Sequence, residues 1–186
     1  FSPLGRIKIL KRMKTFNYYE YNSKRFDRSA KAEQVRNFIF AFKDGKKWAT
    51  DYAADMVAKS FSQTYGEKAG DFVLVCAPAA NSKKYTKRFS HFASKVSQEA
   101  KVQNGNDHLF IYGERTAKHN SVNHVSESFG YRVALDREYF KGKKVIIFDD
   151  VITSGVTAQE FASQLAECGA EVMGAMFLAR TKRMYN

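Results

Sequence analysis

Two adjacent aspartates and the turn that follows them are the residues of this chain whose types and spacing best suit ligand chemistry. They belong to residues 144–157, which read KVIIFDDVITSGVT. Asp149 and Asp150 directly follow an apolar run. Because unpaired carboxylates are costly to bury, we expect both at the exit of a strand and not in its core. There they could accept hydrogen bonds from the vicinal hydroxyls of a sugar.

The residues after the aspartates predict a phosphate site. Hydroxyl side chains, a glycine and the start of a helix would together present N–H and O–H donors, and such donors at a helix N-terminus bind phosphate. The candidate residues are Val151, Ile152, Thr153, Ser154, Gly155, Val156 and Thr157. The alternative is that the aspartates only cap the helix and the hydroxyl residues only form a turn.

Strands and helices are expected to alternate around this segment. Apolar runs at residues 72–76 and 145–148 predict strands that are buried on both faces of a sheet. Further strands are expected at 108–112, 131–135 and 172–178, with amphipathic helices between the strands. This order predicts an α/β fold of three layers, in which a mostly parallel twisted sheet carries helices on both faces. A small N-terminal arm or hood is expected beside it.

Length and composition bound the kind of protein. The 186 residues, 44% of them hydrophobic, suffice for one domain with its own core. We expect residues 31–186 to form this domain and residues 1–30 to form the basic arm. No apolar stretch approaches the roughly 20 residues of a membrane-spanning helix, and the N-terminus is a poor secretory signal. Two cysteines are too few for a disulfide framework, so we expect a cytoplasmic protein without a membrane partner.

The charge of the chain favours anionic partners. The formal net charge is +12, and residues 1–50 alone carry 13 Lys and Arg against 4 Asp and Glu. Such a surface attracts phosphates or nucleic acid, and the aromatic residues at positions 16–21 could stack on single-stranded nucleic acid. We expect this segment to pack onto the domain instead. A basic surface without a dedicated partner is the remaining alternative.

Residues 144–157 resemble the signature with which type I phosphoribosyltransferases bind phosphoribosyl pyrophosphate (PRPP). That signature is an apolar strand, two acidic residues, two apolar residues and Thr-Thr/Ser-Gly. The resemblance implies that Asp149 and Asp150 contact the ribose hydroxyls and that residues 151–157 bind the 5′-phosphate. Residues 35–45 (VRNFIFAFKDG) and 76–91 are similar, less specifically, to the ComF-like and amidophosphoribosyltransferase-like branch of the family. The resemblance covers the chain from roughly residue 30 to residue 180.

The resemblance also implies a loop that binds the pyrophosphate of PRPP. In this chain the loop would follow the strand at 72–76, and its Ala77–Pro78 bond is a candidate for the cis form. The candidate pyrophosphate ligands are Ala79, Ala80, Asn81, Ser82, Lys87 and Arg88. Lys118 is the candidate cation of the flexible catalytic loop, and Mg²⁺ is expected to arrive with PRPP near the aspartates without a cage of protein ligands. The alternative is an ordinary turn from strand to helix.

The function implied by the resemblance is that of a phosphoribosyltransferase, a pentosyltransferase of nucleotide metabolism. It would use PRPP, Mg²⁺ and a small nitrogenous acceptor that the sequence does not identify; such domains often pair as homodimers. No glutaminase activity is expected. Where the branch has Arg-Gly-Phe-Asn-Gln, residues 87–91 read KRFSH, and residues 116–128 replace its arginine-rich loop. These departures leave two alternatives: a non-catalytic PRPP-sensing or nucleic-acid-handling protein, or an α/β protein whose anion site is filled only adventitiously.

Overall fold

Five parallel strands form the main sheet of the computed structural model, which describes residues 13–116 and 130–182. Their order across the sheet is β1-β7-β6-β2-β3. The strands span Lys14–Tyr21 (β1), Phe72–Cys76 (β2), Gln103–Asn104 (β3), Lys144–Ile152 (β6) and Glu171–Thr181 (β7). Each neighbouring pair is parallel. The carboxyl ends of these strands therefore point toward the same edge of the sheet.

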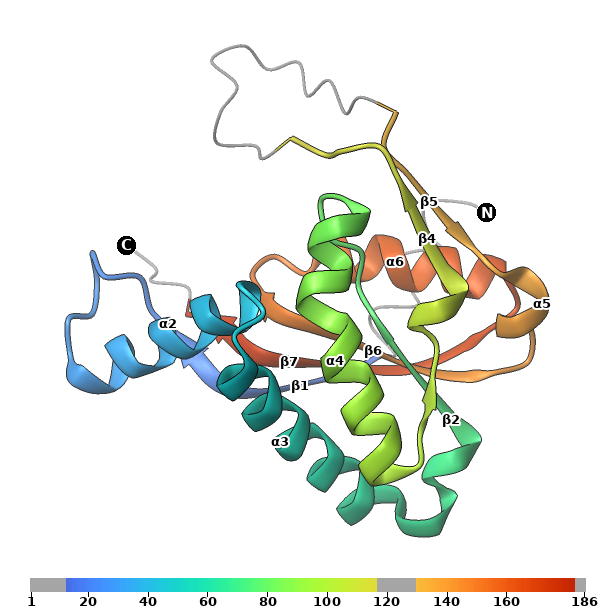
Figure 1. Cartoon of the computed structure of the whole chain (residues 1–186), viewed down its shortest axis with the longest axis horizontal. Coiled ribbons are helices and arrows are strands. Elements are labelled where there is room, and N and C mark those ends of the chain that lie inside the picture. Colours follow the sequence, from blue (N-terminus) through green and yellow to red (C-terminus); the bar gives the residue numbers. More distant parts are fainter. Residues whose placement is uncertain (1–12, 117–129, 183–186) are drawn as a thin grey trace.

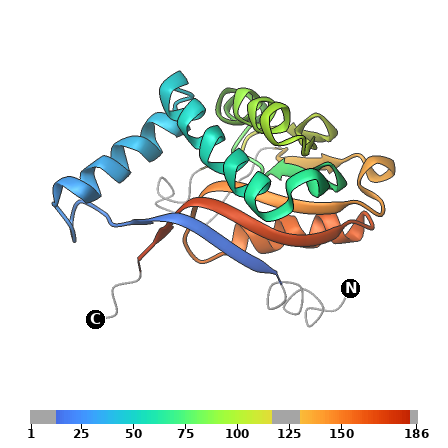
Figure 2. The ribbon, with the colours of Figure 1, turned by 90° about the horizontal axis from the view of Figure 1, so that it is seen from below.

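Helices cover both faces of the sheet (Figures 1 and 2). The helices α2, α3 and α4 lie over one face, and α6 lies over the other. The α-helices span Ala30–Lys43 (α2), Lys47–Tyr65 (α3), Ser82–Ala100 (α4), Arg137–Phe140 (α5) and Val156–Glu167 (α6), and 3₁₀ turns span Gly66–Asp71 and Asn106–His108. The three-layer, mostly parallel α/β architecture predicted from the sequence is confirmed.

The strands near residues 110 and 133 do not join the main sheet. Leu109–Tyr112 (β4) and Arg132–Leu135 (β5) instead pair antiparallel as a separate two-stranded sheet. Along β4 buried and exposed residues alternate, with Leu109 and Ile111 inside. A strand with one wet face suits such a hairpin, whereas strands inside an α/β sheet are apolar throughout. Figure 1 shows this hairpin beside the N-terminal half of α4.

An aromatic core lies between β6 and the helices that cover it. The buried ring of Phe148, near the middle of β6, stacks on Phe92 of α4 with a centroid distance of 4.2 Å. It also meets the edges of Phe42 in α2 and Phe89 in α4. Phe148 directly precedes the two aspartates, so this packing fixes the backbone that carries them.

The segment before α2 belongs to the sheet. Strand β1 is its edge strand and pairs with β7. Tyr18 lies 2.6 Å, hydroxyl to hydroxyl, from Ser60 of α3, and Tyr19 packs edge-on against Phe38 of α2. These contacts hold the aromatic side chains against the domain, as expected for packing. Among residues 13–116 and 130–182, no helix has the length and apolar character needed to cross a membrane.

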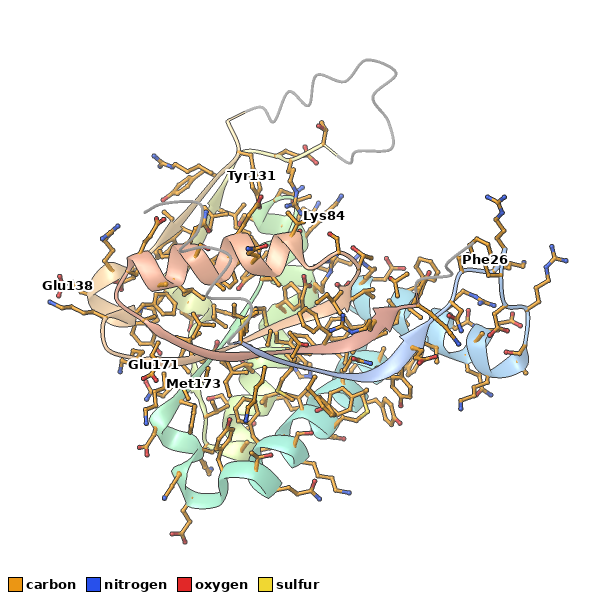
Figure 3. The ribbon with its side chains drawn as sticks, turned by 180° about the vertical axis from the view of Figure 1, so that it is seen from behind. Phe26, Lys84, Tyr131, Glu138, Glu171 and Met173 are labelled. Carbon is orange, nitrogen blue, oxygen red and sulfur yellow. The ribbon has the colours of Figure 1, made fainter. Side chains whose placement is uncertain are left out.

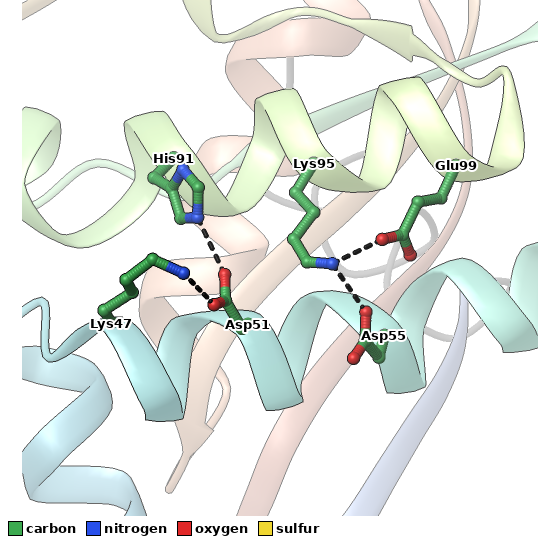
Figure 4. Close-up of polar contacts among 6 residues, drawn as sticks. All are labelled: Lys47, Asp51, Asp55, His91, Lys95 and Glu99. Atoms are coloured by element: carbon green, nitrogen blue, oxygen red, sulfur yellow. Dashed lines mark hydrogen bonds and ion pairs between the residues drawn. The ribbon is translucent and has the colours of Figure 1, made fainter.

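A row of polar contacts joins α3 to α4 on the outer surface (Figure 4). Asp51 of α3 accepts a hydrogen bond from Lys47 at 2.6 Å and contacts the imidazole of His91 at 2.8 Å. Lys95 of α4 then bonds Asp55 of α3 at 2.8 Å and also pairs with Glu99. The hydrogen bonds of Lys47 and His91 lower the pKa of Asp51 from 3.8 to about 2.

This lowered pKa predicts a small, acid-sensitive contribution to stability. Because the folded pKa lies below the unfolded one, the contribution is present above pH 3.8 and is lost as the pH falls through about 2. The variant Asp51→Asn should therefore lower the thermal midpoint near neutral pH, by a margin that shrinks as the solution is acidified. Thermal melts over a pH series check this. Asp71→Asn, at an exposed position outside this row of contacts, is the control, and an equal pH dependence in both variants would contradict the prediction.

Candidate functional site

Strand β6 carries the two aspartates inside the sheet. The strand continues to Ile152, and Asp149 is paired in register with Phe177 of β7. The expectation that both carboxylates lie beyond the end of the strand was therefore wrong. The argument behind it assumed unpaired carboxylates, and the structure supplies Asp150 with partners.

Asp150 is buried and ion-paired with two cations. Its exposed fraction is 4%. Its Oδ2 lies 2.7 Å from Nζ of Lys43 at the end of α2 and 3.8 Å from Nη1 of Arg88 in α4. Its Oδ1 accepts a hydrogen bond from the N–H of Val151 at 2.8 Å. Burial alone would raise the pKa of Asp150, but the charges of Lys43 and Arg88 outweigh it and hold the pKa below its ordinary value.

Asp149 has fewer partners. Its Oδ1 accepts a hydrogen bond from the N–H of Asp150 at 2.8 Å, and its Oδ2 accepts none from a described donor. The residue is partly exposed. Burial of the carboxyl group, followed by the charge of Asp150, holds the pKa of Asp149 well above its ordinary value. The two neighbouring carboxyl groups therefore differ in pKa and in exposure.

The turn after β6 leads directly into the N-terminus of α6. Gly155 is the N-cap, with φ of 82°, a left-handed value that favours glycine. No side chain caps the helix, although Ser154 Oγ accepts a long, 3.4 Å hydrogen bond from the N–H of Val156. Thr153, Ser154 and Thr157 are exposed, whereas Val151 and Ile152 lie in β6. The exposed hydroxyls and the first N–H groups of α6 form a donor-rich turn suited to an anion.

The loop between β2 and α4 is held by residues that flank the β4–β5 hairpin. The carbonyl oxygen of Ala79 accepts from the Tyr131 hydroxyl at 3.0 Å, and that of Ala80 accepts from the N–H of Arg115 at 2.8 Å. Asn81 caps α4 and also donates to Glu114 at 3.2 Å. Figure 3 shows Tyr131 and Lys84, in the first turn of α4, at the same end of the molecule.

The Ala77–Pro78 bond is trans, since no cis peptide bond occurs among the described residues. It was the candidate for a cis bond, so this expectation is corrected. Ser82 is the first residue of α4.

The lysine and arginine side chains that were predicted to bind PRPP do not lie together. Lys87 is exposed on α4, whereas the Arg88 side chain is 18% exposed and places Nη1 3.8 Å from Asp150 Oδ2. Lys118 lies outside the described residues. Two cations were missed by the sequence analysis: Lys43, within the quoted segment 35–45, and Arg115, whose guanidinium lies 5.4 Å from the centroid of the Tyr131 ring. A lysine just before a glycine turn was the only signal for Lys43.

A cavity of about 430 Å³ lies between α4 and β4. Its lining includes Ser82, Thr86, Asp107, Phe110 and Tyr112. It shares only Ser82 with the predicted ligand residues, so the tandem aspartates and the Gly155 turn form a separate site.

The described residues contain no cluster of three or more His, Cys, Asp or Glu side chains that could hold a metal ion. A cation at the aspartates would therefore need ligand oxygens from a substrate. The carboxylate oxygens present are of the kind that Mg²⁺ prefers.

Comparisons with known proteins give a family match. A family model described as a phosphoribosyl transferase domain matches residues 51–185. Among solved structures, adenine phosphoribosyltransferase from Thermoanaerobacter pseudethanolicus is similar, with 13% identity, coverage of 73% of this chain and 82% of that one, and a TM-score of 0.44. A hypoxanthine-guanine phosphoribosyltransferase from Bacillus anthracis shows 14% identity, coverage of 74% and 72%, and a TM-score of 0.42. A search of curated proteins found no match.

Proposed function

The chain belongs to the phosphoribosyl transferase domain family, and from this premise we propose that it transfers the phosphoribosyl group of PRPP to a small nitrogenous acceptor with the help of Mg²⁺. The observation that carries the proposal is that β6, which bears the partly exposed Asp149, leads through the Gly155 turn into the N-terminus of α6. Ligands of parallel α/β sheets bind at the carboxyl edge. A carboxylate next to a donor-rich turn suits the hydroxyls and the phosphate of one sugar phosphate.

Each part of PRPP has a matching group in this arrangement. The carboxylate of Asp149 accepts hydrogen bonds from ribose hydroxyls. The 5′-phosphate binds Thr153, Ser154 and Thr157 and the first N–H groups of α6, where the helix dipole favours negative charge. The pyrophosphate binds the loop at 79–82, with Lys87 as a nearby cation.

The reaction needs positioning more than covalent chemistry from the protein. A bond forms between the acceptor nitrogen and C1 of the ribose while the bond from C1 to the pyrophosphate oxygen breaks. Pyrophosphate leaves with the bonding electrons, and the acceptor nitrogen loses a proton. Positive charge develops at the ribose, and the carboxylates of β6 stabilise it electrostatically. The turn and loop hold the reacting groups in register.

The carboxylate oxygens near Asp149 suit a Mg²⁺ ion that is also bound by oxygens of the substrate. Asp149 Oδ2 accepts no hydrogen bond from a described donor, and the residue is partly exposed, which supports its assignment to the ion or to its bound water. When bound, Mg²⁺ would offset the charge of the leaving pyrophosphate.

Two measurements test the proposal. Calorimetric titration with PRPP and Mg²⁺ should give saturable binding, and pyrophosphate release should appear with a member of a panel of purines, pyrimidines, ammonia and amines. The absence of both binding heat and a thermal shift at millimolar PRPP and Mg²⁺ would overturn the proposal. Binding without turnover on any acceptor would instead favour a PRPP-sensing protein. Asp55→Asn, which alters only a surface ion pair with Lys95, is the matched control for charge and should behave as wild type.

A further inference from the structure

The two adjacent aspartates of β6 are bonded in different ways. Asp150 Oδ1 accepts a hydrogen bond from the N–H of Val151, and its buried Oδ2 forms ion pairs with Lys43 and Arg88 but accepts no hydrogen bond within the described residues. Asp149 is held only at Oδ1, and the group that holds it is the backbone N–H of Asp150. The backbone N–H of Asp150 therefore orients Asp149, whose Oδ2 accepts no hydrogen bond from a described donor.

The cations on Asp150 come from two helices that are packed together beside it. Lys43 ends α2, and the turn that follows contains Gly45, with φ of 67°. A Cβ at Gly45 would lie 2.6 Å from the carbonyl oxygen of Lys87, the residue before Arg88. The turn after Lys43 thus lies directly on the backbone of α4. This contact fixes the spacing between the two cations that share Asp150.

We propose that the two carboxylates have separate tasks: Asp149 binds the ribose, and Lys43, with Arg88, is a positioning residue that acts through Asp150. The proposal rests on the proposed function, because it assigns roles within the PRPP site. Asp150 cannot readily accept ribose hydroxyls as well, since it is 4% exposed and its ion pairs would have to be broken. Arg88, predicted from the sequence as a pyrophosphate ligand, is assigned here to Asp150.

A rival role for Lys43 is direct contact with PRPP. Its side chain is 37% exposed, so a swing from Asp150 to a phosphate is sterically open. The two roles differ in their dependence on Asp150. A residue that acts through Asp150 loses its effect when Asp150 loses its charge, whereas a direct contact keeps its effect. A double-mutant cycle measures this difference.

The cycle uses Lys43→Met, Asp150→Asn and the double variant, with PRPP and Mg²⁺ as the titrant in calorimetry. We expect Lys43→Met to lower the affinity about tenfold in the wild-type background and less than about twofold in the Asp150→Asn background. Lys43→Arg, which keeps a cation for Asp150, should stay within about threefold of wild type. Lys47→Met, which removes the same charge from an exposed side chain at the start of α3, is the control and should bind as wild type.

The outcomes separate the alternatives. An equal loss in both backgrounds would show that Lys43 contacts PRPP and would overturn the proposal. An unchanged affinity of folded Lys43→Met would show a purely structural ion pair and would also overturn it. Thermal melts report whether each variant folds, and Lys43→Gln, which keeps a hydrogen-bond donor, replaces Lys43→Met if that variant does not. Failure of the wild-type protein to bind PRPP would instead refute the proposed function, on which this division of tasks depends.

Discussion

Replacing Asp149 with asparagine is expected to weaken the binding of PRPP and Mg²⁺ by about tenfold to about a hundredfold. Asparagine keeps the shape of the side chain and can still accept the hydrogen bond from the N–H of Asp150. It loses the negative charge that would face ribose hydroxyls and Mg²⁺. Hydrogen bonds to charged groups contribute about 1.5–3 kcal/mol each, which corresponds to this range of affinity. Calorimetry with PRPP and Mg²⁺ measures the loss directly.

The same variant should become more stable than wild type as the pH rises, because wild type loses stability. The pKa of Asp149 is held well above its ordinary value by burial and by Asp150. A carboxyl group whose folded pKa exceeds its unfolded pKa contributes stability at low pH and loses that contribution as the pH rises through the folded value. Ionisation of Asp149 at high pH therefore lowers the free energy of unfolding of wild type, and this loss is absent in Asp149→Asn. Melts over a pH series should show the two midpoints diverging, with the variant higher.

The combination of weaker binding and higher stability is characteristic of a binding residue whose charge is costly to the free protein. Asp55→Asn is the control, because it removes a carboxylate from the α3 surface, and its affinity for PRPP should be unchanged. If Asp149→Asn bound PRPP as wild type does, the assignment of Asp149 to the ribose would be wrong.

The strands that carry the site could be predicted because their signals are local. Residues 72–76 are apolar without interruption, and each is buried in β2. The run at 145–148 likewise predicts β6, and the order of aspartates, hydroxyls and glycine after it marks the turn into α6. The alternation along β4, by contrast, was a signal for a strand with one exposed face, and it separates the hairpin from the main sheet.

The partners of Asp150 could not be predicted from the sequence. Lys43 lies at the end of α2 and Asp150 near the end of β6, and the ion pair between them depends on how α2 and α4 pack over the sheet. Arg88 has the same ambiguity, because its position on α4 allows either the pyrophosphate loop or Asp150. The rule that unpaired carboxylates avoid the core was sound, but pairing is a tertiary property.

Replacing Gly45 with alanine is expected to destabilise the protein and to weaken PRPP binding together. A non-glycine residue with left-handed backbone costs roughly 1–2 kcal/mol, and the φ of 67° at Gly45 is of this kind. The new Cβ would also lie 2.6 Å from the Lys87 carbonyl oxygen, and relieving such overpacking costs about another 1–3 kcal/mol. The turn would move away from α4 and take Lys43 away from Asp150.

Gly142→Ala separates the two costs. Gly142 has a φ of 73°, and a Cβ there would meet nothing within 4 Å. Denaturant unfolding should therefore show only the backbone cost of roughly 1–2 kcal/mol in Gly142→Ala, and its affinity for PRPP should match wild type. Equal losses of stability in the two variants would mean that the contact between the turn and α4 contributes nothing. The position of Lys43 would then have to depend on its ion pair with Asp150 alone.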